Sequence, residues 1–235
     1  MKVIKRYFLI FFFTFSFLHS QNLEGLSGLF YIPTADIGKD SEVTVGASFV
    51  DKKLISFSGY NEDAITPYIT VNFLPFIEFS VRITHLLDSI ITTQGIGDRT
   101  VSIRIRLVEE NEYVPSILVG LHDIIGIYGG AEAVRNNALY LALSKHLTIS
   151  SKIINKVSLH TGYGTDIINA QNHKFIGLFG GISCSFLSFI ELIGEYDTIR
   201  FNSGVRIALF NKIKLLAGFI DMKKFSGSLS YSFQL

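Results

Sequence analysis

The chain has 235 residues, of which 48% are hydrophobic and only 17% charged, and its formal net charge is +1. This composition excludes a disordered protein and argues against a nucleic-acid-binding one. The hydrophobic content is typical of a helical membrane protein. After residue 20, however, no apolar run reaches the roughly 18 residues that a spanning helix needs. The chain is therefore rich in apolar residues without containing an apolar block.

Residues 1–20 have the pattern of a secretory signal peptide. Lysines and an arginine in the first six residues precede a Phe-rich apolar stretch over residues 7–18, and Ser20 is a small residue at a plausible cleavage point. The alternative is an uncleaved membrane anchor, which the short apolar stretch disfavours. Cys184 is the only cysteine, so the chain has no internal disulfide. We expect an exported protein whose mature part, residues 21–235, is a single domain.

From residue 42 onward, apolar and polar residues alternate. Some segments alternate strictly and others more weakly; in chain order they cover residues 43–49, 68–74, 77–83, 101–107, 116–122, 138–145, 157–164, 176–186, 189–196, 205–209, 213–220 and 229–235. A period of two with one apolar face predicts strands that separate two different environments. Most of the segments also have about the length of a tilted strand that crosses a bilayer.

The connections between these segments differ in length. Tight turns lie at residues 75–76, 187–188 and 211–212, and connections of intermediate length at 109–115 and 146–156. The alternate connections are generally longer, over residues 51–64, 86–98, 123–137 and 165–173, with two short exceptions around Thr198 and Met222. Aromatic residues flank the tight turns, as in the girdles of membrane barrels. Short turns at one end and long loops at the other are typical of bacterial outer-membrane barrels, whose turns face the periplasm.

We therefore predict an all-β fold, a transmembrane antiparallel up-and-down β-barrel of about 12 strands, in the outer membrane of a Gram-negative bacterium. The alternative is a soluble β-sandwich. A sandwich core accounts for alternating strands, but it does not favour long loops at one end only.

If the apolar faces contact lipid, the polar faces line the barrel interior. Charges of opposite sign then fall on neighbouring strands in two groups, which are Glu78, Arg82, Arg104 and Arg106, and Glu191, Glu195 and Arg206. Such charges can pair across strands in a narrow interior. The network either rigidifies and fills the interior, the role that we favour, or forms a charged constriction that selects a polar or acidic passenger.

Signals for enzymatic activity are few. None of the histidines after the leader has metal-ligand spacing with a carboxylate or cysteine. His122 and Asp123 can be drawn as a triad with Ser144, but neighbours on a strand point to opposite faces. We expect a non-enzymatic protein without a cofactor or a metal site.

Several segments, in order, resemble the family of YjbH-like exopolysaccharide-biosynthesis proteins. GLSGLFYIPTA at residues 25–35 is similar to the family's N-terminal GLtGLinmPsA segment, and residues 97–115 are similar to its D…k.RLl.Eg.ylP block. GLHDIIG at 120–126 and YLALSK at 140–145 resemble its GlqDiiGTG and YlvaSK elements. The matched positions of interest are Gly25, Gly28, Pro33, Asp98, Glu109, Pro115, His122, Asp123 and Gly126. His122 stands where the family usually has Gln.

The resemblance implies an outer-membrane barrel that acts in exopolysaccharide production or export. Its implied partners are membrane lipid, polysaccharide and other envelope secretion proteins, with no nucleic acid. Two other functions stay open: an outer-membrane enzyme that modifies lipid or lipopolysaccharide, and a small passive pore or structural barrel. The sequence also leaves open whether residues 25–35 form a strand or tuck into the barrel as a plug. Their glycines and Pro33 favour the plug.

Overall fold

The computed structural model describes residues 21–55, 62–87, 98–128, 136–149, 151, 153–170, 175–187, 189–210 and 212–235. The leader expected at residues 1–20 lies outside this part of the chain. The strands are β1 (Glu42–Val50), β2 (Ala64–Phe73), β3 (Ile77–Leu86), β4 (Asp98–Val108), β5 (Ser116–His122), β6 (Ala138–Thr148), β7 (Ile154–Thr165), β8 (Gly177–Phe186), β9 (Ile190–Tyr196), β10 (Phe201–Leu209), β11 (Ile213–Ile220) and β12 (Lys224–Gln234). Within these described ranges, two short helices, α1 (Lys52–Ile55) and α3 (Ile124–Tyr128), lie in connections.

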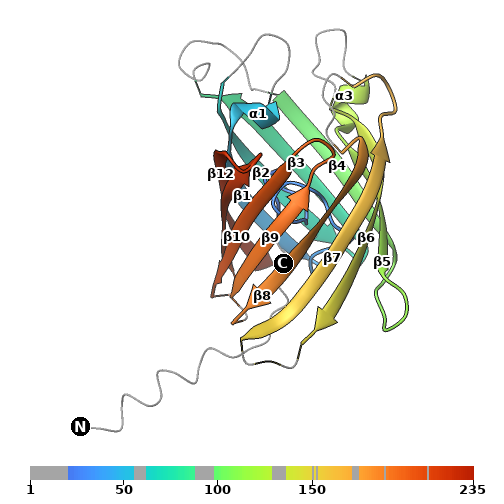
Figure 1. Cartoon of the computed structure of the whole chain (residues 1–235). Helices are drawn as coiled ribbons and strands as arrows, with labels where there is room; N and C mark the ends of the chain where they lie inside the picture. The colour runs from blue at the N-terminus through green and yellow to red at the C-terminus, as the bar shows by residue number, and fades with distance from the viewer. Residues whose placement is uncertain are drawn as a thin grey trace, which may run out of the picture.

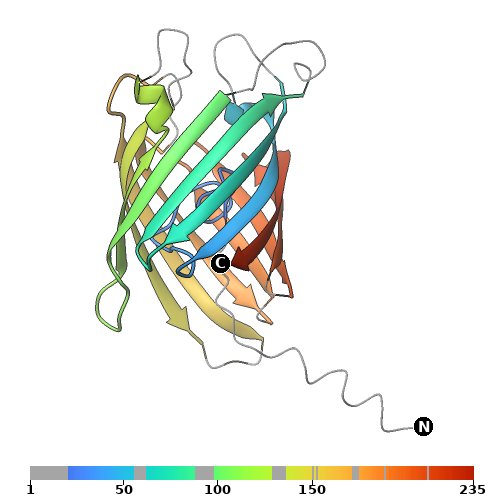
Figure 2. The same ribbon diagram turned by 180° about the vertical axis from the view of Figure 1, so that it is seen from behind.

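The strands form one closed barrel (Figures 1 and 2). Each strand pairs antiparallel with its neighbours in sequence, and β1 closes the ring by pairing with β12 in a register that sets Val45 opposite Tyr231. Closure leaves no sheet edge with unpaired backbone groups. The prediction of an antiparallel up-and-down barrel of about 12 strands is thereby confirmed, and the structure has 12.

The alternation in the sequence places apolar side chains outside the barrel and polar side chains inside it. In β2, Ile65 and Ile69 are exposed on the outer face, whereas Thr66 and Thr70 are buried. A soluble domain has the reverse arrangement. An apolar surface around a polar interior is typical of a barrel whose surroundings are lipid.

None of the helices in the described ranges has both the length and the apolar character that a membrane crossing requires.

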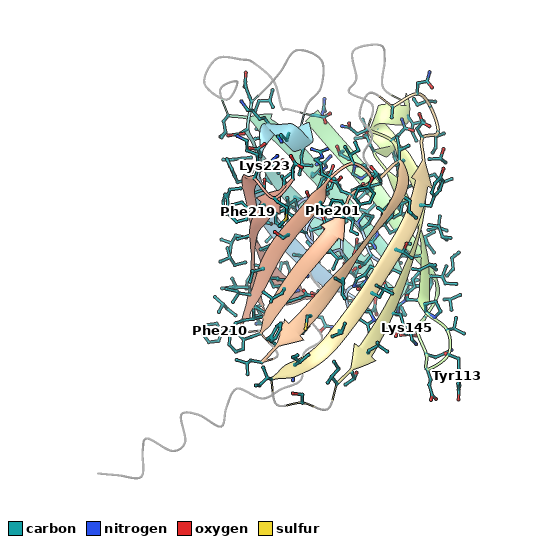
Figure 3. All side chains as sticks on the ribbon, in the orientation of Figure 1. Tyr113, Lys145, Phe201, Phe210, Phe219 and Lys223 are labelled. Carbon is teal, nitrogen blue, oxygen red and sulfur yellow. The ribbon has the colours of Figure 1, made fainter. Side chains whose placement is uncertain are left out.

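Exposed aromatic side chains stand on the outer surface near both ends of the barrel. Phe201 and Phe219 lie toward one end, and Phe210 lies toward the other (Figure 3). Aromatic rings suit the two interfaces of a bilayer because their faces are apolar and their edges tolerate headgroups. Their positions are therefore consistent with two aromatic girdles, one at each interface of the bilayer.

The two ends of the barrel differ. Helices α1 and α3 lie in connections at one end, and the β4–β5 turn lies at the opposite end (Figure 1). At three turns of that opposite end, Leu74, Leu187 and Phe210 have positive φ values of 60°, 49° and 53°. Turns with positive φ match the right-handed twist of antiparallel strands, so these strands reverse direction within a few residues.

Residues 21–37 fold inside the barrel, and we call this segment the plug (Figure 2). Every plug residue except Asp36 is buried. Leu23, Phe30 and Ile32 join barrel residues in one hydrophobic cluster. In the structure this segment forms two isolated bridges within itself and belongs to none of the barrel strands, so the tucked conformation is the observed one.

Candidate functional site

Hydrogen bonds fold the plug back on itself. Leu23 N donates to Phe30 O at 3.0 Å, which brings the two arms of the segment together. Asn22 fixes the turn, since its Oδ1 accepts from Leu26 N at 3.1 Å and its Nδ2 donates to Tyr31 O at 2.6 Å. An asparagine side chain can take the place of backbone in this way. The plug is thus a folded element and not a loose tail.

Two glycines of the family segment let the plug pass close to other atoms. Gly25 has a φ of +77°, and a Cβ added there would lie 2.7 Å from Tyr68 Cγ. A Cβ added at Gly28 would lie 2.3 Å from Ile32 O, near the bridge that Gly28 forms with Pro33. Both contacts are shorter than van der Waals separation. The segment therefore needs glycine at these positions to fold as it does.

The first link between the barrel and the plug is a buried ion pair. Arg104 Nη1 lies 2.6 Å from Glu78 Oε1, and both side chains are fully buried. Glu78 accepts the backbone N–H of Ser27 at 3.0 Å and also its hydroxyl. Arg104 donates to the carbonyl oxygens of Ser27 at 2.8 Å, Asp36 at 3.2 Å and Thr34. Plug groups thus supply the additional hydrogen bonds that a buried ion pair requires.

A second ion pair contacts the middle of the plug. Arg206 pairs with Glu191, and both side chains are buried. Nη2 of Arg206 donates to Gly28 O at 2.7 Å and to Leu29 O at 2.6 Å. This guanidinium therefore holds two consecutive plug carbonyls.

Glu195 holds the next residues of the plug through their N–H groups. Its carboxylate accepts from Phe30 N at 3.0 Å, Tyr31 N at 2.9 Å and Ile32 N at 3.3 Å. Asn202 Nδ2 donates to the same carboxylate at 3.1 Å. Successive backbone N–H groups form a concavity that binds an anion, and here the anion is a barrel side chain.

A third group joins the start of the plug to β3 and β5. Arg82 forms an ion pair with Glu24, and His122 Nε2 lies 3.7 Å from the same carboxylate. The other ring nitrogen of His122 is 2.9 Å from Ser102 Oγ. Glu24 could not be recognised from the sequence, because it precedes the family segment and lies on no alternating strand.

Apolar contacts complete the seat of the plug. A Cβ at Gly204 would lie 2.7 Å from the Phe30 ring, so the glycine leaves space for that ring. Tyr31 packs against Phe175 with ring centroids 5.4 Å apart. Burial raises the pKa of the Tyr31 phenol well above its ordinary value. The phenol therefore stays neutral while the plug is docked.

The other residues singled out from the sequence lie away from the plug. Arg106 is near the turn end of β4, where it donates to Pro75 O at 2.6 Å and lies 3.5 Å from Glu109. It is separate from the ion pairs that hold the plug. Pro115 directly precedes β5, and Asp98 is the first residue of β4.

Asp123 directly precedes helix α3, and Gly126 lies within that helix. Asp123 Oδ1 accepts from Gly126 N at 3.0 Å, and its Oδ2 accepts from Asn136 N at 2.8 Å. A Cβ at Gly126 would lie 2.2 Å from the same carboxylate, so this capping arrangement requires glycine. The structure gives both motif residues a role in shaping the connection after β5.

The residues that can be drawn as a catalytic triad have other partners. The carboxylate of Asp123 caps α3, and the ring of His122 bonds to Ser102. Ser144 Oγ is 2.8 Å from His160 Nδ1 and accepts from Ala35 N at the same distance. This arrangement leaves no path from Ser144 through His122 to Asp123.

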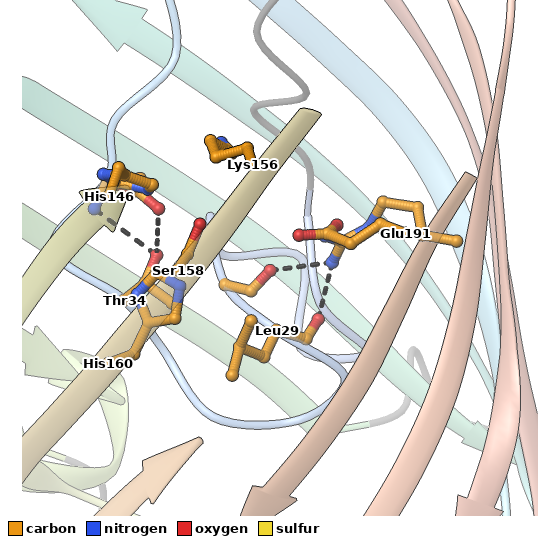
Figure 4. Close-up of a pocket in the computed structure, with 10 residues that line it drawn as sticks. Leu29, Thr34, His146, Lys156, Ser158, His160 and Glu191 are labelled. Atoms are coloured by element: carbon orange, nitrogen blue, oxygen red, sulfur yellow. Dashed lines mark hydrogen bonds and ion pairs between the residues drawn. The ribbon is translucent and has the colours of Figure 1, made fainter. Parts of the chain in front are cut away.

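A recess lies between the plug and the barrel wall (Figure 4). Its empty volume is about 280 Å³, including space open to solvent, and it is lined by Gly28, Leu29, Thr34, Asp36, His146, Lys156, Ser158, His160, Glu191 and Arg206. Asp36, His146 and His160 bring potential metal-ligating atoms within 4.8 Å of one another. This cluster differs from the expectation of no metal site, because the positions of these residues in the sequence follow no metal-ligand spacing.

Comparison with known proteins agrees with the motifs. The YjbH family model, described as exopolysaccharide biosynthesis protein YbjH, matches residues 20–214. No curated protein matches the chain. Similar solved structures include a KdgM porin (TM-score 0.48) and a KdgM porin in complex with disordered oligogalacturonate (TM-score 0.46); each is 12% identical, with 83% of this chain and 99% of the porin chain covered. Since the family model spans most of the sequence, this chain belongs to the YjbH family.

Proposed function

We propose that this chain is an outer-membrane β-barrel that acts without catalysis in exopolysaccharide production or export, and that the plug closes its interior at rest. The description of the YjbH family supports the polysaccharide role. The observation that carries the proposal is the plugged polar interior: Arg104, Arg206 and Glu195 all bind plug backbone. The interior charges are thus engaged by a segment of the same chain.

The chemistry of these contacts suits exchange between the plug and a glycan. A guanidinium that binds peptide carbonyls can also donate to sugar hydroxyls, and a carboxylate that accepts from N–H groups can accept from hydroxyls. A polymer that displaced the plug would find donors and acceptors already in place.

The outer surface supports a location in the outer membrane. Exposed apolar side chains on alternate positions form a lipid-facing belt, with exposed aromatic rings toward both ends. Together with the leader expected at residues 1–20, this belt supports export to and insertion into that membrane. The tight turns, the start of β1 and the end of β12 then face the periplasm, and the longer connections face outward.

Deletion and complementation test the proposed function. In a strain without the gene, we expect loss of extracellular polysaccharide, measured as hexose in the washed surface fraction, and recovery with the wild-type gene. Barrel assembly is checked by the shift in gel mobility between unboiled and boiled samples. Unchanged polysaccharide in the deletion strain, with ion conductance by the purified protein, would instead establish a passive pore. Hydrolysis of lipid in detergent that is lost in His122→Ala would establish an enzyme.

A further inference from the structure

The recess brings together three side chains from distant parts of the chain. Asp36 comes from the end of the plug, His146 from β6 and His160 from β7, and their ligating atoms all lie within 4.8 Å of one another. His146 Nε2 is already 3.5 Å from Asp36 Oδ1. In a tetrahedral zinc site, with bonds of roughly 2.0–2.1 Å, neighbouring ligand atoms are about 3.4 Å apart. Small side-chain rotations would bring the third ligand to that separation.

Both histidine rings are oriented through the nitrogen that faces away from the group. Nδ1 of His146 bonds to a Glu110 carboxylate oxygen, and Nδ1 of His160 lies 2.8 Å from Ser144 Oγ. The Nε2 atoms are thereby left as the ligating nitrogens. A carboxylate that bonds the second nitrogen of a histidine is the usual outer partner of a metal-bound imidazole, because it fixes the tautomer and increases ligand basicity.

Asp36 is oriented as well. Thr34 Oγ1 donates to Asp36 Oδ2 at 3.1 Å, which leaves Oδ1 directed to His146. Figure 4 shows His146, His160 and Thr34 on one side of the recess, with Glu191 and Leu29 on the other and Lys156 between them. The recess has space for about one water molecule, which could serve as the fourth ligand.

We propose that Asp36, His146 and His160 bind a divalent transition-metal ion of the Zn²⁺ class, and that this ion fastens the end of the plug to β6 and β7. Two imidazoles and one carboxylate are a ligand set that suits Zn²⁺. Because Asp36 belongs to the plug and the histidines to the barrel wall, binding joins two elements that separate when the plug leaves. The ion therefore stabilises the docked plug.

Metal titration of the full mature chain tests this proposal. The protein is refolded in detergent without a polyhistidine tag, treated with EDTA and titrated with Zn²⁺ against a chromophoric chelator, and Co²⁺ absorption reports the coordination geometry. We expect one ion per chain and a tetrahedral Co²⁺ spectrum. His146→Ala, His160→Ala and Asp36→Asn should each weaken Zn²⁺ binding by about 100-fold or more, and Glu110→Gln by about 10–100-fold.

His85→Ala is the matched control, since His85 lies on β3 and is not one of the three ligands. Its affinity should equal that of the wild type, and each variant is first shown to fold by heat-modifiable gel mobility. Zn²⁺ should also raise the urea midpoint of the wild type in proportion to the logarithm of its concentration, but not that of Asp36→Asn. Equal Zn²⁺ affinity in wild type, His146→Ala and His160→Ala would overturn the site. Equal affinity in Asp36→Asn alone would overturn the link to the plug.

Discussion

Gly25 and Gly194 differ sharply in their surroundings, although both lie in or beside the barrel wall. Gly25 has positive φ, and a Cβ there would meet the Tyr68 ring, whereas a Cβ at Gly194 would meet nothing within 4 Å. Of these two glycines, only Gly25 must lack a side chain for the plug to dock as it does. At Gly25 the family motif therefore reflects a steric requirement of the plug and not a residue that takes part in chemistry.

Gly25→Ala should therefore destabilise the docked plug, and Gly194→Ala should not. We expect a loss of at least about 1–3 kcal/mol at Gly25 from the backbone conformation alone. The measurement is the rate at which a protease cleaves the plug of the folded barrel. Equal protection of the two variants would contradict the packing described for Gly25.

Glu110 lies in the connection between β4 and β5, and its ionisation should make the stability of the protein depend on pH. Burial alone would raise the pKa of this carboxyl, but hydrogen bonds from His146 and Lys145 outweigh it, so the pKa is lowered. A lowered pKa in the folded state means that the ionised form stabilises the protein. This contribution is complete above the unfolded-state pKa of about 4.3 and is lost as the pH falls through the lower folded-state value.

The wild type should be more stable than Glu110→Gln at about pH 5–6, and this difference should shrink below about pH 4. The difference is measured from urea unfolding midpoints of the two proteins across this range in metal-free buffer. A difference that grows on acidification would show that the folded-state pKa is raised.

At the scale of elements, the plug and the barrel wall are held by charged groups whose partners are mostly plug backbone. Glu195 accepts N–H groups from Phe30, Tyr31 and Ile32. Hydrogen bonds to a charged group contribute about 1.5–3 kcal/mol each when one partner is removed. The loss of one such carboxylate should thus shift the equilibrium toward an undocked plug.

Glu195→Gln should raise the frequency of conductance events in planar bilayers by about tenfold or more, because an amide cannot accept as many hydrogen bonds as a carboxylate. Glu109→Gln is the matched control, since Glu109 is an exposed side chain at the β4–β5 turn. The proposed role of Glu195 fails if both variants conduct like the wild type.

The strands were predictable from the sequence, and the plug contacts were predictable only in part. Alternation fixes which face of a strand carries Glu78, Arg104 and Arg206, because this pattern is local. Alternation does not reveal what fills the interior, so nothing in the sequence indicated that Glu24 contacts the barrel wall. The metal-ligating group was likewise hidden, since it depends on how the plug meets the β6–β7 pair.

The whole molecule depends on an apolar exterior that is continuous in space although it is discontinuous in sequence. Leu229 lies in the middle of β12 and is 57% exposed, with Leu215 and Ala47 opposite it on the two neighbouring strands. Leu209 is also exposed, but it is the last residue of β10, at the turn end of the barrel. If lipid surrounds the barrel, these two leucines lie at different depths in the bilayer.

Arginine at the two positions should therefore have different costs. Leu229→Arg should destabilise the barrel by about 2–4 kcal/mol, and Leu209→Arg by about 0–1 kcal/mol, because the cost of a charge on the lipid face falls from the bilayer midplane to the interface. The free energy of unfolding is measured for each protein in phospholipid vesicles. In water both substitutions would place a charge on a solvent-exposed surface at little cost, so equal and small effects in vesicles would mean that this face does not contact lipid.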